Sequence, residues 1–157
     1  MSTRSTCHGT FVVERVYPVP PARVFDAWSD PAAKARWFVG PEEWCQEGHE
    51  LDFRVGGRER LSGGPADGSL HVFEALYHEI VSQQRIIYAY DMYLDRTRIS
   101  VSLVTVEMEP SGSGTRMVFT EQAVFLDGHE TPEGREKGTR VLLDQLNVEL
   151  QGHRRGA

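Results

Sequence analysis

Glu121 is the acidic residue of this sequence that is best placed to do chemistry. In a strand pattern over residues 115–125 it shares a face with Met117 and Phe119, because alternate residues of a strand point to the same side. A carboxyl group beside two large apolar side chains is partly desolvated, which raises its pKa and suits it to act as a general acid. A rim carboxylate paired with a nearby arginine is the alternative, and the sequence leaves both interpretations open.

Two tyrosines form a second candidate group. Tyr88 and Tyr90 share one face of an alternating strand pattern with Met92, and Asp91 marks the opposite face as the solvent side. We therefore expect the tyrosines to point inward, where each hydroxyl needs a partner in the core or, in a cavity, a ligand or water. In the preceding strand the sequence does not decide whether the face of Phe73 is the concave one.

Other catalytic patterns are absent from the sequence. The six histidines form no metal-binding set, since His49-Glu50 and His78-Glu79 are adjacent pairs whose side chains diverge on a strand. The serines lack the nucleophile elbow of a hydrolase. Gly112-Ser113-Gly114 is followed by a strand pattern and not by a helix, so it is no phosphate cradle. We expect neither a metal nor a cofactor.

The composition predicts one globular domain, residues 1–157, with tails at 1–9 and 152–157. A formal net charge of −6 argues against a nucleic-acid partner. No apolar run approaches the ~18–20 residues of a membrane span, and no apolar signal segment opens the chain. Cys7 and Cys45 are isolated thiols. These features predict a cytoplasmic protein, and a homodimer is left open.

The elements that position these residues begin with one strand and two short helices. Residues 11–17 are rich in β-branched and aromatic side chains and end at a proline. Pro21 suits the first turn of a helix. Asp30-Pro31 caps a second helix, which should end near Trp37.

From Trp44 onward the sequence predicts a meander of antiparallel strands. The expected strands are residues 51–55, 58–61, 70–80, 85–93, 98–109 and 115–125. The first two are joined by a hairpin at Gly56-Gly57, because glycine accepts a positive φ. Trp37 and Trp44 flank the join between helices and sheet, and we interpret them as lids on the core at one end of a cavity. A role in gating the cavity mouth is the alternative.

A long helix is expected over residues 131–151. Leu142, Leu146 and Leu150 form an apolar stripe at helical spacing. Gly138 lies on the same stripe, where alanine would favour the helix by roughly 1 kcal/mol. A helix without side-chain volume on its inward face leaves room for a ligand or packs closely against the sheet, and both remain open.

The ordered markers along the chain form a set that covers about residues 11–150. They are Pro20-Pro21 with Val24-Phe25, Asp30-Pro31, Trp37-Phe38-Val39-Gly40-Pro41, Arg54-Val55-Gly56-Gly57, Arg85-Ile86-Ile87, Thr115-Arg116-Met117 and Gly138 to Leu146. This set resembles the SRPBCC (START-like) superfamily, in the branch named after the activator of the heat-shock-protein-90 ATPase. Two positions depart from that family: Thr139 stands where a tryptophan is frequent, and Glu121 where a histidine is frequent.

The resemblance implies an α+β helix-grip (START/Bet v 1-like) fold. In that fold a curved antiparallel sheet wraps around a long C-terminal helix and a cavity, with two short helices after the first strand. Relatives bind sterols, lipids, plant hormones or polyketide intermediates, and some cyclise or dehydrate them. The co-chaperone that names the branch stimulates its partner's ATPase.

Three functions follow as hypotheses. The leading one is a cytoplasmic binding protein for a small, largely apolar or aromatic ligand held between sheet and helix. The second is a cyclase or dehydratase in which Glu121 and a tyrosine serve as acid and base. The third is a module that modulates a chaperone ATPase, a partner that we do not expect. The candidate ligand-binding residues are Trp37, Trp44, Phe73, Tyr88, Tyr90, Met92, Met117, Phe119, Glu121, Gly138 and Leu142.

Overall fold

The computed structural model describes residues 3–155. The elements follow in the order β1 (Thr6–Tyr17), α1 (Pro21–Ser29), α2 (Pro31–Trp37), β2 (Cys45–Leu51), β3 (Arg58–Gly64), β4 (His71–Val81), β5 (Arg85–Leu94), β6 (Thr97–Ser111), β7 (Gly114–Leu126) and α3 (Pro132–Arg155). Within these residues no helix is both long and apolar enough to cross a membrane.

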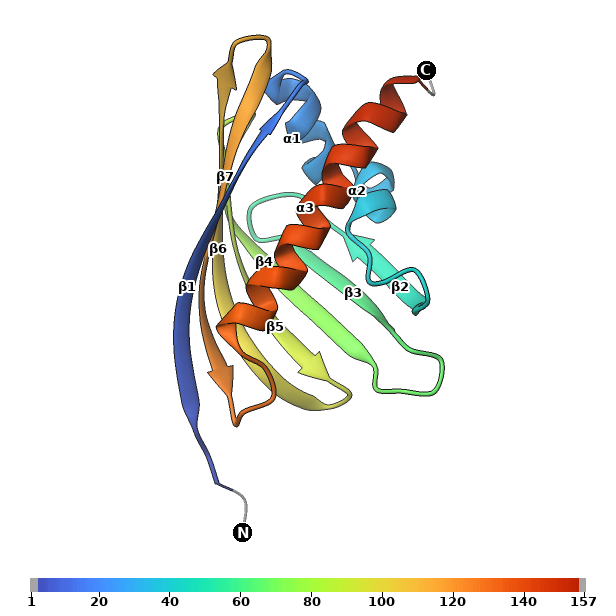
Figure 1. Cartoon of the computed structure of the whole chain (residues 1–157), viewed down its shortest axis with the longest axis vertical. Helices are drawn as coiled ribbons and strands as arrows, with labels where there is room; N and C mark the ends of the chain where they lie inside the picture. Colours follow the sequence, from blue (N-terminus) through green and yellow to red (C-terminus); the bar gives the residue numbers. More distant parts are fainter. Residues whose placement is uncertain (1–2, 156–157) are drawn as a thin grey trace.

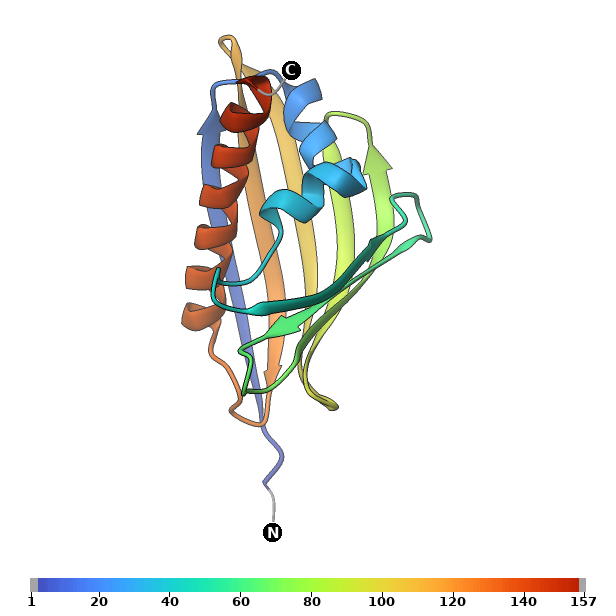
Figure 2. The same ribbon diagram turned by 90° about the vertical axis from the view of Figure 1, so that its right-hand side faces the viewer.

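The seven strands form one antiparallel sheet in the order β1-β7-β6-β5-β4-β3-β2. β2 to β7 are a meander in which each strand pairs with the next, and β1 returns to pair along β7. The sheet is strongly curved, and α3 runs across its concave face while α1 and α2 cover one end (Figure 1). The turned view shows β2 and β3 bending round toward α3 (Figure 2). The predicted helix-grip fold is confirmed.

The second half of α3 is packed firmly in place. Leu143, Leu146 and Leu150 are buried in the core. The Tyr17 hydroxyl donates to the carbonyl of Leu143 at 3.0 Å, which ties α3 to β1. The main neighbours of the α3 backbone among the described elements are β1, α1 and α2. The helix therefore lies along one side of the sheet and stands away from the middle strands.

The helix starts agree with their sequence signals. Asp30 caps α2, since its carboxylate accepts a hydrogen bond from the Ala33 backbone N–H at 3.2 Å, and Pro31 occupies the first turn. Thr131 caps α3 in the same way, because its hydroxyl accepts from the Gly134 backbone N–H at 3.0 Å. Both caps hold the first turn of a helix whose side chains reach the core.

Strand β1 begins earlier than expected, at Thr6 and not at residue 11. β7 extends to Leu126 and supplies ladder partners as far as Thr6, and the Asp127 carboxylate accepts from the Ser5 backbone N–H at 2.9 Å. Strand β1 therefore includes residues 6–9 of the expected tail at 1–9. Helix α3 includes residues 152–155 of the expected tail at 152–157. The outermost residues of both tails, 1–2 and 156–157, lie outside the described residues.

The first hairpin of the meander lies earlier in the chain than predicted. β2 ends at Leu51, so residues 52–57 form the turn and not part of a strand. Gly56 has a φ of 85°, and a Cβ on Gly57 would overlap the carbonyl oxygen of Asp52. β2 is an edge strand of mainly polar, exposed residues, so alternation of hydrophobic residues could not reveal it. β4 to β7 lie within two residues of their predicted bounds.

Candidate functional site

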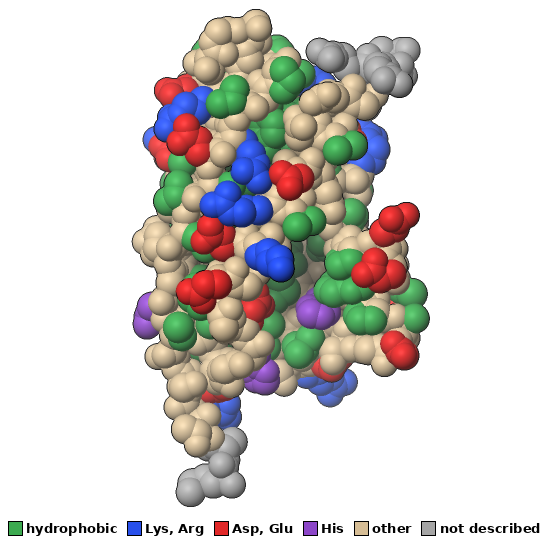
Figure 3. Space-filling model, viewed as in Figure 1, with side chains coloured by type: hydrophobic (Ala, Val, Ile, Leu, Met, Phe, Trp, Pro, Cys, Tyr) green, Lys and Arg blue, Asp and Glu red, His purple; other side chains and the backbone are tan. Residues whose placement is uncertain are grey.

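A cavity of about 700 Å³ lies between the concave face of the sheet and α3, beside the chain that follows α2. This volume is within the usual range of small-molecule sites, roughly 300–1,000 Å³. Hydrophobic side chains line the hollow between α3 and the β2–β3 side of the molecule (Figure 3). The apolar walls include Trp28, Trp37, Phe38, Leu61, Phe73, Met92, Leu94, Ile99, Phe119 and Leu142.

All the candidate residues except Met117 line this cavity. Met117 is fully buried on the same face of β7 as Phe119 and Glu121, but it belongs to the packed core. Met117 lies nearer to the β6–β7 turn than Glu121 does. Alternation along a strand predicts the face of a side chain and not its depth along the sheet, so the assignment of Met117 to the cavity is wrong.

The face of β4 that the sequence left undecided is resolved. Phe73 and Tyr77 are buried on the concave side, whereas Glu74 and His78 are exposed. The Phe73 ring lies 4.7 Å from that of Tyr90 on the neighbouring strand, centroid to centroid. Phe73 is therefore part of the same cavity wall as the two tyrosines.

The two tryptophans at the join occupy different environments. Trp37 is buried and its indole N–H donates to the carbonyl of Ala27 at 2.9 Å, so it belongs to the core under α1 and α2. Trp44 is only half-buried and stacks on His71 with ring centroids 4.4 Å apart. Trp44 therefore lies at the outer part of the cavity, and Trp37 forms an inner wall.

Gly138 lines the cavity and is itself exposed. A Cβ at this position would meet nothing within 4 Å, so the backbone does not pack closely against the sheet. Of the predicted stripe, Leu146 and Leu150 are buried. In the first half of α3 the buried stripe runs through Thr139 and Leu143, one position after the predicted Gly138 and Leu142. Gly138 and half-buried Leu142 thus lie beside the opening of the cavity.

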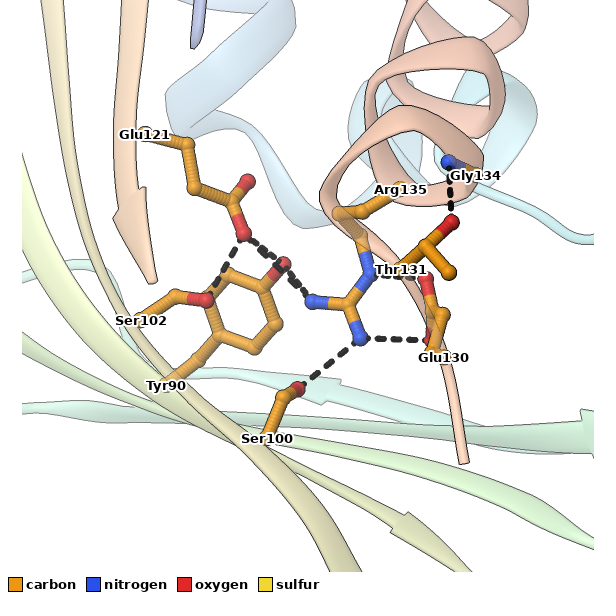
Figure 4. Close-up of polar contacts among 8 residues, drawn as sticks. All are labelled: Tyr90, Ser100, Ser102, Glu121, Glu130, Thr131, Gly134 and Arg135. Carbon is orange, nitrogen blue, oxygen red and sulfur yellow. Dashed lines mark hydrogen bonds and ion pairs between the residues drawn. The ribbon is translucent and has the colours of Figure 1, made fainter. Parts of the chain in front are cut away.

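Glu121 is buried in the cavity wall, with 1% of its surface exposed. Its Oε2 accepts hydrogen bonds from the hydroxyls of Tyr90, at 2.6 Å, and Ser102, at 2.7 Å. The Arg135 guanidinium approaches the same oxygen at 3.4 Å (Figure 4). The carboxylate therefore has an arginine partner, as the second interpretation expected, but deep in the cavity and not at a rim.

Arg135 organises the polar end of the cavity from the first turns of α3. Its guanidinium forms two hydrogen bonds with the Glu130 carboxylate, at 2.7 and 2.8 Å, and donates to the hydroxyls of Tyr90, at 2.7 Å, and Ser100, at 2.8 Å. The Thr131 cap fixes the helix start from which this side chain projects (Figure 4). One buried cation thus contacts two carboxylates and two hydroxyls.

Burial and charge determine the protonation of this group. Desolvation raises the pKa of the Glu121 carboxyl, and the Arg135 charge and the hydrogen bonds from Tyr90 and Ser102 oppose that rise. Burial and the Glu121 charge raise the pKa of Tyr90, which stays neutral. The surrounding acidic groups outweigh desolvation at Arg135, whose pKa is raised, so the guanidinium stays charged.

Two further polar groups in the cavity wall lack partners. The Tyr88 hydroxyl makes no hydrogen bond to any described residue, although only 1% of Tyr88 is exposed. Among residues 3–155 the Trp28 indole N–H is buried without an acceptor. Polar groups prefer to be hydrogen-bonded, so the Tyr88 hydroxyl is available to a polar atom of a bound molecule. The Trp28 nitrogen is fully buried and therefore closed to such a molecule.

A second buried polar cluster lies behind the cavity wall. The Lys34 ammonium donates to the carboxylate of Glu59 at 2.7 Å and to the hydroxyl of Tyr77 at 3.1 Å. It lies 4.4 Å from the centroid of the Phe38 ring, and His49 Nε2 is 2.7 Å from the second Glu59 oxygen. The cluster joins α2 to the sheet. Desolvation raises the pKa of Glu59, but the Lys34 charge and the hydrogen bonds with His49, Lys34 and Tyr77 outweigh it and hold the pKa below its usual value.

Sequence reasoning missed Arg135 and Ser102. Arg135 precedes Thr139 by four residues and Leu143 by eight, so a stripe phased on Leu143 would have included it. Ser102 lies opposite Tyr90 in the β5–β6 ladder, a register that is visible only in the sheet. Among the described residues, no group of three or more His, Cys, Asp and Glu side chains could hold a metal ion.

Comparisons with known proteins agree on the fold. The model of the family described as Activator of Hsp90 ATPase homolog 1-like protein matches residues 18–151. A solved structure of an uncharacterised protein from Rhizobium leguminosarum is 50% identical, with a TM-score of 0.91, over 96% of this chain and 99% of that one.

A protein from Rhizobium loti is 43% identical, with a TM-score of 0.85, over 92% of this chain and 99% of that one. The AHSA1-like protein from Aeromonas hydrophila shares the fold at 20% identity and a TM-score of 0.67, over 92% of this chain and 94% of that one. A search of curated proteins found no match.

Proposed function

Because the chain belongs to the family of Activator of Hsp90 ATPase homolog 1-like proteins, in the SRPBCC superfamily, we propose that it binds a small, largely apolar ligand between the sheet and α3. One observation carries the proposal: a cavity of about 700 Å³ separates the concave face of the sheet from the helix. Its walls are mainly aromatic and aliphatic, and its few polar groups gather around Glu121 and Arg135. An apolar wall with a few fixed polar groups is the usual composition of a ligand site.

The proposed binding energy comes from the apolar wall. Each 100 Å² of apolar surface that a ligand hides from water contributes about 2.5 kcal/mol. Phe73, Tyr90 and Phe119 offer ring faces and edges to this surface, so a flat ring system suits it better than a flexible chain. The polar end then orients the ligand and adds selectivity.

Native mass spectrometry of freshly purified protein tests the proposal. We expect the folded protein to carry an extra mass from an apolar molecule, which denaturation releases. An apolar fluorescent probe such as 1-anilinonaphthalene should also bind saturably, with one site per chain. Protein that carries no extra mass and binds no apolar probe would contradict the proposal.

A lyase that cyclises or dehydrates an aromatic or polyketide-like substrate is the second candidate. The observation that favours it is a buried carboxyl group with a raised pKa in the cavity wall, near the unpartnered hydroxyl of Tyr88. Turnover of an added aromatic polyketide-like compound, abolished by Glu121→Gln, would support it. Binding of such a compound without any conversion would leave the protein a binder.

The proposal includes a cytoplasmic location. Cys7 and Cys45 are exposed thiols that are not joined to each other. Free exposed thiols persist best in a reducing compartment. Fractionation of the native host, with detection of the protein in the cytoplasmic fraction, tests this part.

A further inference from the structure

The two oxygens of the Glu121 carboxylate have different surroundings. Oε2 accepts from Tyr90 and Ser102 and faces Arg135. Oε1 makes no hydrogen bond to any described residue, and it points away from Ser102 and Arg135 (Figure 4). Glu121 lines the cavity while being almost fully buried. Oε1 is not among the fully buried atoms without a partner, so water in the cavity can reach it. An occupant that displaces this water without supplying a donor leaves the acceptor unpaired at a cost of about 1–3 kcal/mol, so this oxygen favours an occupant with a donor.

The charges nearby also favour a donor. Arg135 is the cation of this cluster, and its guanidinium already forms two hydrogen bonds with Glu130. With both carboxylates ionised, the three side chains carry one excess negative charge. His71 and His129 also line the cavity, and desolvation lowers the pKa of His71, which favours its neutral form. An anionic ligand would therefore bring a second negative charge to an acceptor-rich end of the cavity.

Three donors converge on Glu121 Oε2, so the atom at this position must be a hydrogen-bond acceptor. The Arg135 guanidinium can only donate, and it donates to the Tyr90 hydroxyl as well. The Tyr90 hydroxyl therefore directs its own proton to Glu121. This network makes Oε2 an acceptor for groups of the protein, whereas Oε1 is open to a hydrogen bond from a ligand.

We propose that Glu121 Oε1 accepts a hydrogen bond from the bound molecule, so that the cavity selects neutral apolar compounds with an O–H or N–H donor. Phenols and hydroxylated ring systems are the class that this chemistry and the aromatic wall recognise together. The Tyr88 hydroxyl is a second group that can pair with a polar atom of the same molecule. This inference rests on the proposed function, since it requires a ligand in the cavity.

Three naphthalene probes of similar size test the selection directly on the unmodified protein at pH 8, because a higher pH shifts Glu121 toward its carboxylate form. 2-Naphthol carries a donor, 2-methoxynaphthalene keeps the oxygen but lacks the donor, and 2-naphthoate carries a negative charge. By isothermal titration we expect 2-naphthol to bind at least tenfold more tightly than 2-methoxynaphthalene, and 2-naphthoate to bind most weakly. Equal affinities for the first two probes, or tightest binding of the naphthoate, would overturn the inference.

Glu121→Gln supplies a second test that does not depend on the shape of the probes. In this variant the three donors around Oε2 should orient the glutamine amide so that its oxygen takes the place of Oε2. The NH2 group then takes the place of Oε1, where it is a donor and not an acceptor. We expect the preference for 2-naphthol to disappear or reverse, whereas an unchanged preference would contradict the role of Glu121.

Glu133→Gln is the matched control for the loss of one negative charge. Glu133 is exposed in the first turn of α3 and is not part of the cavity wall, so the preference should persist in this variant. If Glu133→Gln abolishes the preference as fully as Glu121→Gln, a general charge effect replaces the inference. Failure of every probe to bind would instead contradict the proposed function, and if all probes bind equally well, only the selection by Glu121 fails.

Discussion

Filling the space at Gly138 gives the sharpest test of the cavity. A Cβ at Gly138 meets nothing within 4 Å, so a leucine side chain enters open space beside the cavity opening. Leucine favours the helix over glycine by about 0.5–1 kcal/mol. For a domain of this size, a gain of that order raises Tm by about 1–4 °C.

Ligand binding should respond in the opposite direction. If the leucine side chain takes the place of about 60 Å² of apolar ligand contact, binding weakens by about 1.5 kcal/mol, or roughly tenfold. We therefore expect Gly138→Leu to melt at a higher temperature and to bind 1-anilinonaphthalene about ten times more weakly. Thermal unfolding and a fluorescence titration measure both effects in the same preparation.

Gly152→Leu is the matched control. Gly152 is an exposed residue of α3 that is not part of the cavity wall, and a Cβ there also meets nothing within 4 Å. It should share the gain in helix stability, reduced by its place near the helix end, and keep normal probe binding. A lower Tm for Gly138→Leu, by the 1–3 kcal/mol typical of overpacking, together with unchanged probe binding would refute the reasoning.

Three further predictions follow from the buried charges and from the family. Lys34→Met should destabilise the protein by about 3–5 kcal/mol in urea unfolding, because it leaves Glu59 buried without its cation. Adding Glu59→Gln should recover part of that loss. If Lys34→Met is as stable as the unmodified protein, the ion pair does not contribute to stability. The raised pKa of Glu121 means that the folded state holds this proton more tightly than the unfolded state, so the stability it contributes is present at low pH and is lost as the pH rises through the folded pKa. From pH 5 to 8 the Tm of the unmodified protein should therefore fall relative to that of Glu121→Gln, and parallel Tm curves would contradict the assignment. The chain alone should not stimulate the ATPase of a heat-shock-protein-90 chaperone, since the likeness to the AHSA1-like protein from Aeromonas hydrophila at 20% identity supports only the fold; a saturable rise in turnover would show otherwise.

Local signals were strong enough to predict most of the elements. Asp30-Pro31 gives the α2 start, because a capping carboxylate and a proline in the first turn act within three residues of the chain. Alternation placed Phe119 and Glu121 on one face of β7 and Tyr88 and Tyr90 on one face of β5. Each of these features depends on neighbours in sequence, which is why the sequence by itself predicted the order of helices and strands and part of the cavity wall. The helix-grip arrangement was implied by the resemblance to the SRPBCC superfamily.

Tertiary structure decided where the first strand begins and which side of α3 faces the sheet. β1 begins as early as Thr6 only because β7, which comes much later in the sequence, provides its ladder partners. The inward stripe of α3 passes through Thr139 and not Gly138, since a period of 3.6 residues does not specify which of two adjacent rows faces the sheet. That shift of one residue turned Arg135 inward and placed Gly138 beside the cavity opening.

The partners of Glu121 were likewise beyond the sequence. Its carboxylate meets Tyr90 of β5, Ser102 of β6 and Arg135 of α3, three side chains that are brought together by strand register and by the path of the last helix. Burial raises the pKa of this carboxyl group, and Arg135, Tyr90 and Ser102 oppose that rise. Glu121 has one hydrogen-bonded oxygen and one open oxygen because its partners come from three elements that are close in space and distant in the sequence.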